Sequence, residues 1–150
     1  MAASNGISFA NVYIEVSVDG GQNWVDFSGD TNKVDIGGGE RAVSEFFVPN
    51  ADIPALTAGK RGSLDITANV VFDPASGSPW ETVLQAYESG TPVAFRWVPA
   101  GNASGNERFT GTGFITTPVY PPGDATSADM VAMDFTIKVP KITRDQVPAA

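Results

Sequence analysis

The stretch from Gly59 to Pro99 constrains the fold of this chain most, because it has the pattern of strand, short helix, strand. Apolar residues alternate with polar ones from Leu64 to Phe72, which is the period-two pattern of a half-buried strand. Asp73-Pro74 ends that strand, since proline lacks the N–H that a sheet ladder needs. The alternation resumes over residues 93–97 and predicts a second strand.

One helix is predicted between these two strands, over about residues 79–89. Ser78 is a suitable N-cap, Pro79 suits the first helical position, and Glu81 completes a capping box. Gly90 is placed to end the helix in a left-handed conformation. Apolar residues recur at helical spacing, namely Trp80, Val83, Leu84 and Tyr87. One face of the helix is therefore apolar and requires a sheet to pack against.

The remainder of the chain carries strand patterns. Further strands are predicted at residues 12–18, 24–27, 43–48, 108–117 and 131–139. Gly111 and Gly113, inside one of these strands, predict a bulge or a close approach by another backbone. The sequence therefore predicts a mainly β protein: a β-sandwich or partly closed barrel with one flanking α-helix.

The 150 residues are predicted to form a single domain with long connecting segments. Residues 1–10 predict an N-terminal arm, and residues 141–150 predict a polar C-terminal tail. Residues 28–42 predict a long loop, because three successive glycines make this segment flexible. Long loops in a compact domain often bind ligands or neighbouring subunits.

The composition excludes several classes of chemistry. The chain has no histidine and no cysteine, so it cannot build a Ser-His or Cys-His nucleophile pair or the usual zinc site. Its acidic residues are spread singly, and the two that lie closest to the helix, Asp73 and Glu81, are explained by a turn and a capping box. We therefore expect no enzyme activity, no catalytic residue, no cofactor and no metal site.

The charge excludes further partners. The net charge is −8, and the nine Lys and Arg residues are scattered, which argues against tight binding to a phosphate backbone. No run of eighteen apolar residues occurs, so neither a membrane span nor a membrane partner is expected. The sequence lacks a charged start followed by an apolar block, so a secretory signal is not expected.

The sequence SVDGGQNW, from Ser17 to Trp24, resembles the Asp-box of sialidases, with Asn23 where threonine is usual. The box recurs in each propeller blade of those families and occurs once here, so we favour a hairpin turn. The three tryptophans leave open an alternative, a carbohydrate-binding or adhesin-like β-sandwich on a particle surface. A glycosidase is a third alternative, but the sequence offers no suitable pair of carboxylates.

An ordered set of motifs over residues 59–117 resembles the tail tube (major tail) proteins of long-tailed bacteriophages, and the flanks resemble them more loosely. The pieces are Lys60-Arg61-Gly62, Asp65-Ile66-Thr67, Asp73-Pro74, Pro79-Trp80-Glu81, the VAFRWVP run at 93–99, Phe109-Thr110-Gly111-Thr112-Gly113 and Asp134-Phe135-Thr136-Ile137.

This resemblance implies a structural virion protein. Its subunits would form rings, typically hexameric, that stack into a hollow tail tube through which double-stranded DNA passes without specific binding. The implied partners are further copies of the same chain and other tail proteins such as the tape measure and the tail terminator. The implied location is the phage tail, assembled in the cytoplasm of the host bacterium. Related tubes occur in gene-transfer particles and contractile secretion machines.

Two sets of candidate residues follow. The polar faces of two long strands are candidates for the channel wall: Asp65, Thr67, Asn69, Asp134, Thr136 and Lys138. The 28–42 loop and the strand after it are candidates for contacts between subunits: Asp30, Lys33, Asp35, Gly37, Gly38, Gly39, Glu40, Arg41, Phe46 and Phe47. Phe46 and Phe47 lie on opposite faces of their strand, which suggests burial on both sides, on one of them by another subunit. An acidic wall would repel a sliding polyanion.

Overall fold

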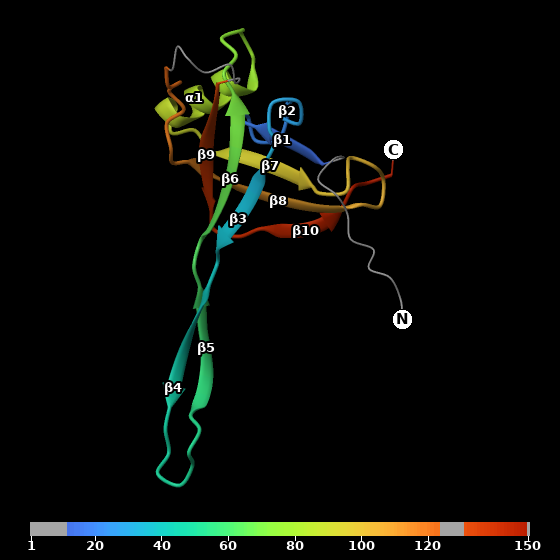
Figure 1. Ribbon diagram of the computed structural model, residues 1–150. Coiled ribbons are helices and arrows are strands. Elements are labelled where there is room, and N and C mark those ends of the chain that lie inside the picture. Colours follow the sequence, from blue (N-terminus) through green and yellow to red (C-terminus); the bar gives the residue numbers. More distant parts are fainter. Residues whose placement is uncertain (1–11, 124–130, 150) are drawn as a thin grey trace.

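The computed structural model describes residues 12–123 and 131–149 as a body of packed strands with one helix and a projecting two-stranded arm (Figure 1). The strands are β1 (Tyr13–Ser17), β2 (Val25–Asp26), β3 (Val34–Gly38), β4 (Arg41–Phe46), β5 (Ala55–Arg61), β6 (Leu64–Val71), β7 (Val93–Val98), β8 (Glu107–Ile115), β9 (Ala132–Val139) and β10 (Thr143–Gln146), and the helix is α1 (Pro79–Ser89). The N-terminal arm predicted at residues 1–10 lies outside the described residues.

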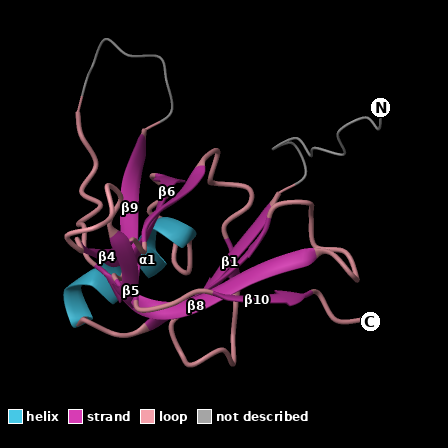
Figure 2. Cartoon of the chain, turned by 90° about the horizontal axis from the view of Figure 1, so that it is seen from below, coloured by secondary structure: helices cyan, strands magenta, loops and turns pink. Residues whose placement is uncertain are grey.

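The body is one folded antiparallel sheet. Its strands follow the order β2-β1-β7-β8-β9-β6-β3, and β10 is added beside β8. Strand β8 serves two layers, because residues 109–113 pair with β7 whereas residues 114–115 pair with β9. The sheet turns back on itself at β8 without closing into a barrel (Figure 2). The predicted mainly β, sandwich-like fold is confirmed.

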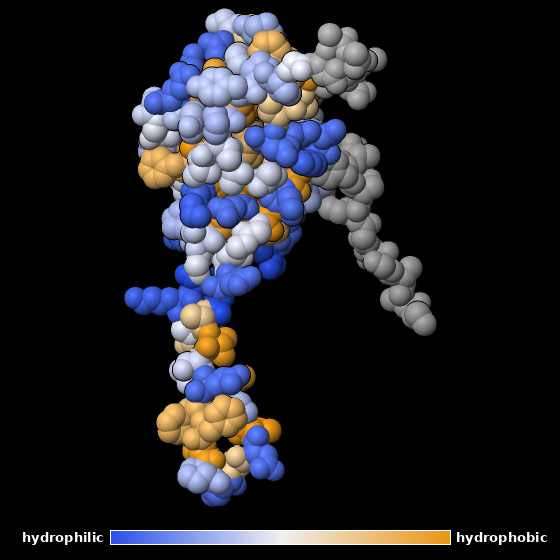
Figure 3. Space-filling model, turned by 60° about the vertical axis from the view of Figure 1, so that its left-hand side comes forward, coloured by the Kyte–Doolittle hydropathy of each residue, from blue (hydrophilic) through white to orange (hydrophobic). Residues whose placement is uncertain are grey.

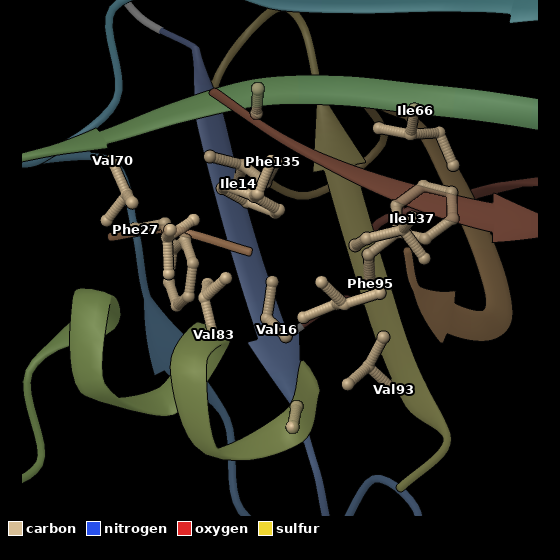
Figure 4. Close-up of a cluster of buried hydrophobic side chains, with 14 of the residues drawn as sticks. Ile14, Val16, Phe27, Ile66, Val70, Val83, Val93, Phe95, Phe135 and Ile137 are labelled. Atoms are coloured by element: carbon tan, nitrogen blue, oxygen red, sulfur yellow. The ribbon is translucent and has the colours of Figure 1, made fainter. Parts of the chain in front are cut away.

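The two layers enclose one hydrophobic core (Figure 4). Alternate residues point into it from both layers, for example Val93 and Phe95 from β7 and Phe135 and Ile137 from β9, all buried. Phe27 meets Phe135 edge to face, with ring centroids 5.9 Å apart, a favoured aromatic geometry. The apolar faces predicted from alternation at residues 64–72 and 131–139 are therefore the core faces.

Helix α1 covers one end of this core and contacts β6 and β8. The Ser78 hydroxyl accepts a hydrogen bond from the Glu81 N–H at 3.2 Å, which caps the helix as predicted. Gly90 ends it with a φ of 69°. The indole N–H of Trp80 donates to the Val119 carbonyl at 2.8 Å and ties the helix to the segment after β8. The predicted helix at 79–89 is confirmed at both ends.

Two glycines in β8 permit the sheet to fold. A Cβ atom on Gly113 would overlap the carbonyl oxygen of Lys138 in β9. A Cβ atom on Gly111 would lie 2.7 Å from the Phe95 ring and 3.1 Å from the carbonyl oxygen of Lys141. The predicted close approach of another backbone at these glycines is confirmed.

The structure corrects two predicted segments. Residues 28–42 are not one long loop, because Val34–Gly38 form β3, which pairs with β6, and β4 begins at Arg41. Strand β3 has few apolar residues because it lies at the edge of the sheet, where β6 is its one partner among the described strands. The tail at 141–150 is not wholly irregular either, because β10 pairs with β8. Ion pairs between β8 and β10, not apolar contacts, hold β10 in register. The sequence of β10 therefore shows no alternation of apolar and polar residues from which a strand could be predicted.

We expect Gly113→Ala to lower the free energy of unfolding by about 1–3 kcal/mol, because the added methyl group forces β8 and β9 apart. Gly37→Ala in β3 is the matched control, since no described atom lies within 4 Å of its added Cβ. Denaturant titrations of both variants would measure the difference. Equal stability of the two variants would contradict this account of the β8–β9 contact.

Candidate assembly surfaces

Strands β4 and β5 form a hairpin that projects from the body as an arm (Figure 1). They pair from Arg41↔Arg61 to Phe46↔Ala55, with a register shift between Arg41 and Val43. Among the described strands, none outside the hairpin pairs with either of them, and every residue of both is exposed. A two-stranded hairpin alone is marginally stable in water, so a covering surface would stabilise this arm.

The arm carries large apolar side chains on both of its faces. Residues that pair across strands share a face, so Leu56, opposite Glu45, lies on one face, and Phe46, opposite Ala55, lies on the other. The exposed apolar residues of the arm and its tip are Val43 (58%), Phe46 (67%), Phe47 (62%), Val48 (40%), Ile53 (78%) and Leu56 (65%). Figure 3 shows apolar residues gathered along the arm away from the body. Exposed apolar surface of this kind is typical of sites where proteins bind one another.

The predicted inter-subunit residues divide between the arm and the body. Arg41 and Phe46 are the two ends of β4, Phe47 follows it, and Glu40 lies at the root of the arm. The body holds Asp30, Lys33, Asp35, Gly37, Gly38 and Gly39 in β3 and the segments beside it. Sequence reasoning missed Ile53 and Leu56, which lie in a segment where no strand was predicted. Their apolar character was the available signal.

The structure brings all six predicted wall residues together on one face. Strands β6 and β9 pair in a register that sets Asp65 opposite Lys138, Thr67 opposite Thr136, and Asn69 opposite Asp134. The alternate residues of both strands form the core, so this polar set faces away from it. The two sets of residues, far apart in the sequence, therefore make one continuous polar surface.

The lysines on this polar surface are paired with acids. Lys138 lies 3.5 Å from the Asp65 carboxylate, and Lys33 lies 3.1 Å from the Asp134 carboxylate. The Thr67 and Thr136 hydroxyls share a hydrogen bond of 3.3 Å between these ion pairs. The paired groups are about half exposed, with side-chain exposures between 44% and 57%. The surface therefore presents no lysine without a neighbouring carboxylate.

Asn69 differs from the other five residues of this set, because it is 8% exposed. Its side-chain oxygen accepts hydrogen bonds from the backbone N–H groups of Asn32 (2.9 Å) and Lys33 (3.2 Å), and its amide nitrogen donates to the Asn32 side chain. The Thr31 hydroxyl donates to the Asn69 carbonyl at 2.8 Å. Asn69 thus anchors the segment that leads into β3.

The turn from Ser17 to Trp24 is held by one carboxylate. Asp19 accepts hydrogen bonds from the backbone N–H of Asn23 (2.9 Å) and from the Ser17 hydroxyl (2.7 Å). These bonds lower the pKa of Asp19 to about 2, because they favour the charged form. The Trp24 indole donates to the Gly21 carbonyl. The Asp-box-like sequence thus forms the hairpin turn that joins β1 to β2, as we favoured.

A groove of about 440 Å³ lies beside this turn, on the layer that contains β7, β8 and β10. The Arg96 guanidinium lies over the Trp24 ring, 3.9 Å from its centroid. Arg108 forms a bidentate ion pair with Asp145, with N···O distances of 3.1 and 2.8 Å. Arg108 lowers the pKa of the Asp145 carboxyl, and Asp145 raises the pKa of Arg108. Trp80 and Trp97 contribute to the core, so the three tryptophans do not form one sugar-stacking platform.

Within the described ranges, no group of three or more His, Cys, Asp or Glu side chains is placed to hold a metal ion. In the same part of the chain, no helix has the length and apolar character needed to cross a lipid bilayer.

No protein-family model matches the chain. No curated protein matches its sequence. Solved structures match nearly its full length. The sheath/tube terminator of the PVC extracellular contractile injection system has a TM-score of 0.66 at 14% identity, covering 96% of this chain and 99% of that one. The tail of a GTA particle, determined with C6 symmetry, has a TM-score of 0.69 at 12% identity, covering 94% and 98%.

The tube-terminating cap of the anti-feeding prophage is also similar, with a TM-score of 0.62 at 16% identity over 97% of this chain and 95% of that one. Likeness at this level of identity establishes a shared fold. The similar proteins are parts of tubes, sheaths or tails according to their descriptions. The resemblance to tail tube proteins seen in the sequence therefore holds for the fold.

We expect the double variant Asp65→Asn/Asp134→Asn to bind duplex DNA more tightly than the natural chain, because it frees Lys138 and Lys33 from their carboxylate partners. Two new phosphate contacts would make the slope of the logarithm of the binding constant against the logarithm of the salt concentration more negative by about two. Fluorescence anisotropy across a salt series would measure it.

The control Asp52→Asn/Glu88→Gln removes the same net charge without freeing a cation, since neither acid has an ion-pair partner among the described residues. It should leave the slope near that of the natural chain. Equal slopes for the two double variants would show that only net charge matters.

Proposed function

We propose that this chain is a tail tube protein that self-assembles into stacked hexameric rings, which form a hollow tube for the passage of double-stranded DNA. The observation that carries the proposal is the arm, whose two faces both expose large apolar side chains beyond the body. Its natural partner is another copy, because the body has the fold of components that assemble into tubes and tails. The C6 symmetry of the similar GTA tail supports six subunits per ring.

The edge strand β3 supports the proposed contacts within a ring. It pairs with β6 on one side, and among the described strands it has no partner on the other. Unpaired backbone groups along an edge strand are a template for pairing with another chain. In this proposal, the edge of β3 serves contacts within a ring, and the arm reaches toward a neighbouring ring.

The β6–β9 polar surface is the proposed channel wall. Its lysines are paired with Asp65 and Asp134, so it offers a phosphate backbone no free cation. Six chains of net charge −8 give about −48 per ring, which repels a polyanion and favours its sliding. The partners in this proposal are further copies, the tape measure and the tail terminator. The location is the phage tail, built in the cytoplasm of the host bacterium.

Electron microscopy of the concentrated protein tests this function. We expect rings or tubes roughly 100 Å wide, about the span of six small domains around a channel. A protein that stays monomeric at every concentration, including in the presence of a tail-initiating partner, would refute the proposal.

We expect Phe46→Ser/Phe47→Ser to abolish tube formation while leaving the thermal unfolding of the monomer within a few degrees of the natural chain. Both side chains are more than 60% exposed, so their removal costs the monomer little buried apolar area. Sedimentation velocity and microscopy would follow assembly.

Phe114→Ser is the control for the loss of an exposed aromatic side chain. Phe114 is 52% exposed and lies opposite Lys138 in the β8–β9 ladder. In the proposed tube that face borders the open channel, so this variant should still assemble. Tubes formed by the Phe46/Phe47 variant, or their loss in the Phe114 variant, would contradict the assignment of the arm.

A further inference from the structure

The basic residues of the chain fall into two groups. Five of the nine Lys and Arg side chains form ion pairs within the body: Lys33, Arg96, Arg108, Lys138 and Arg144. The other four have no ion pair with a described carboxylate, and they gather where the arm joins the body: Arg41, Lys60, Arg61 and Lys141. We call these four residues the basic collar. Figure 3 shows strongly hydrophilic residues at this junction, between the body and the apolar arm.

The collar is electrostatically unfavourable in the isolated chain. Arg41 and Arg61 are direct partners in the β4–β5 ladder, and like charges placed directly opposite each other destabilise a sheet. Lys60 adjoins this pair, and Arg61 and Lys141 line the same recess beside Gly38 and Gly39. All four residues of the collar are exposed. An acidic surface on another molecule would relieve this repulsion.

The opposite end of the molecule is acidic. Figure 1 places α1 and the loop before it at the end of the body farthest from the arm. Residues 62–95, which contain that loop and helix, include no Lys or Arg, whereas they include Asp73, Glu81 and Glu88. Glu81 lies in the first turn of α1, and the last turn contains no basic residue. The molecule therefore has a basic end and an acidic end.

We infer that the basic collar of one copy docks against the acidic α1 end of a second copy, so that charge sets the head-to-tail direction of stacking. Such a contact is heterologous and repeats without closing, which is the geometry of an open-ended stack. Electrostatic complementarity of this kind fixes orientation and speeds association. The inference rests on the proposed function, because it assigns the contact between successive rings.

Two charge-reversal variants test this contact. Lys60→Glu/Arg61→Glu makes the arm end acidic, and Glu81→Lys/Glu88→Lys makes the helix end basic. Each variant alone should stack poorly, with a critical concentration raised by about tenfold or more, because like charges now meet at the junction. An equimolar mixture should stack again, since each variant offers the end that the other lacks. Thermal unfolding of each variant confirms that it is folded.

Single variants provide the matched control. Arg61→Glu and Arg144→Glu change the net charge equally, and Arg144 lies away from the collar, in the β8–β10 ladder, where it pairs with Glu107. Thermal unfolding must show that both single variants remain folded. Only Arg61→Glu should weaken stacking, and stacking of the natural chain should weaken as salt rises. Equal effects of the two single variants, or no restoration in the mixture, would overturn the inference. If the natural chain formed neither rings nor tubes, the proposed function itself would fail.

Discussion

The fold depends on the close contact between β8 and β9. Because Gly113 has no side chain, the backbone of β9 can lie against β8 while the earlier part of β8 still pairs with β7. One strand thereby joins two layers, and the layers meet over a single core that the helix covers at one end. Without that contact the two layers would share no strand, and only the packing of their apolar faces would hold them together.

Strand β6 shows how the same residues serve the core and the outer surface. Ile66, Ala68 and Val70 are fully buried on one face, and Asp65, Thr67 and Asn69 form polar contacts on the other. The core side fixes the position of the polar side, since a shift of one residue would exchange the two faces. The ion pairs of the polar surface are therefore positioned by the rigid core beneath them.

Sequence reasoning succeeded where the relevant contacts lie within one molecule. Helix α1 has a cap at each end, and β6 and β9 alternate strictly because one face of each is buried in this chain's own core. It failed for β3, where only Val34 and Ile36 precede the glycines, and for β5, where no buried face imposes alternation. Alternation placed Asp65 and Lys138 on the polar faces of their strands, but their register and ion pair required the pairing of two strands far apart in the sequence. The charges of the collar were visible in the sequence, and their gathering was not.

The exposed hairpin also determines how growth would begin. An arm that is only marginally stable alone is stabilised when another surface covers it. The conformational entropy lost in this step is least compensated when the first few subunits meet in solution. A subunit that joins an existing end finds a formed surface, whereas two free subunits must organise each other. In the proposed assembly, polymerisation would therefore have a lag phase that a template removes. The place and time at which a tube starts are then decided by the molecule that supplies the first surface, and free subunits can accumulate beforehand.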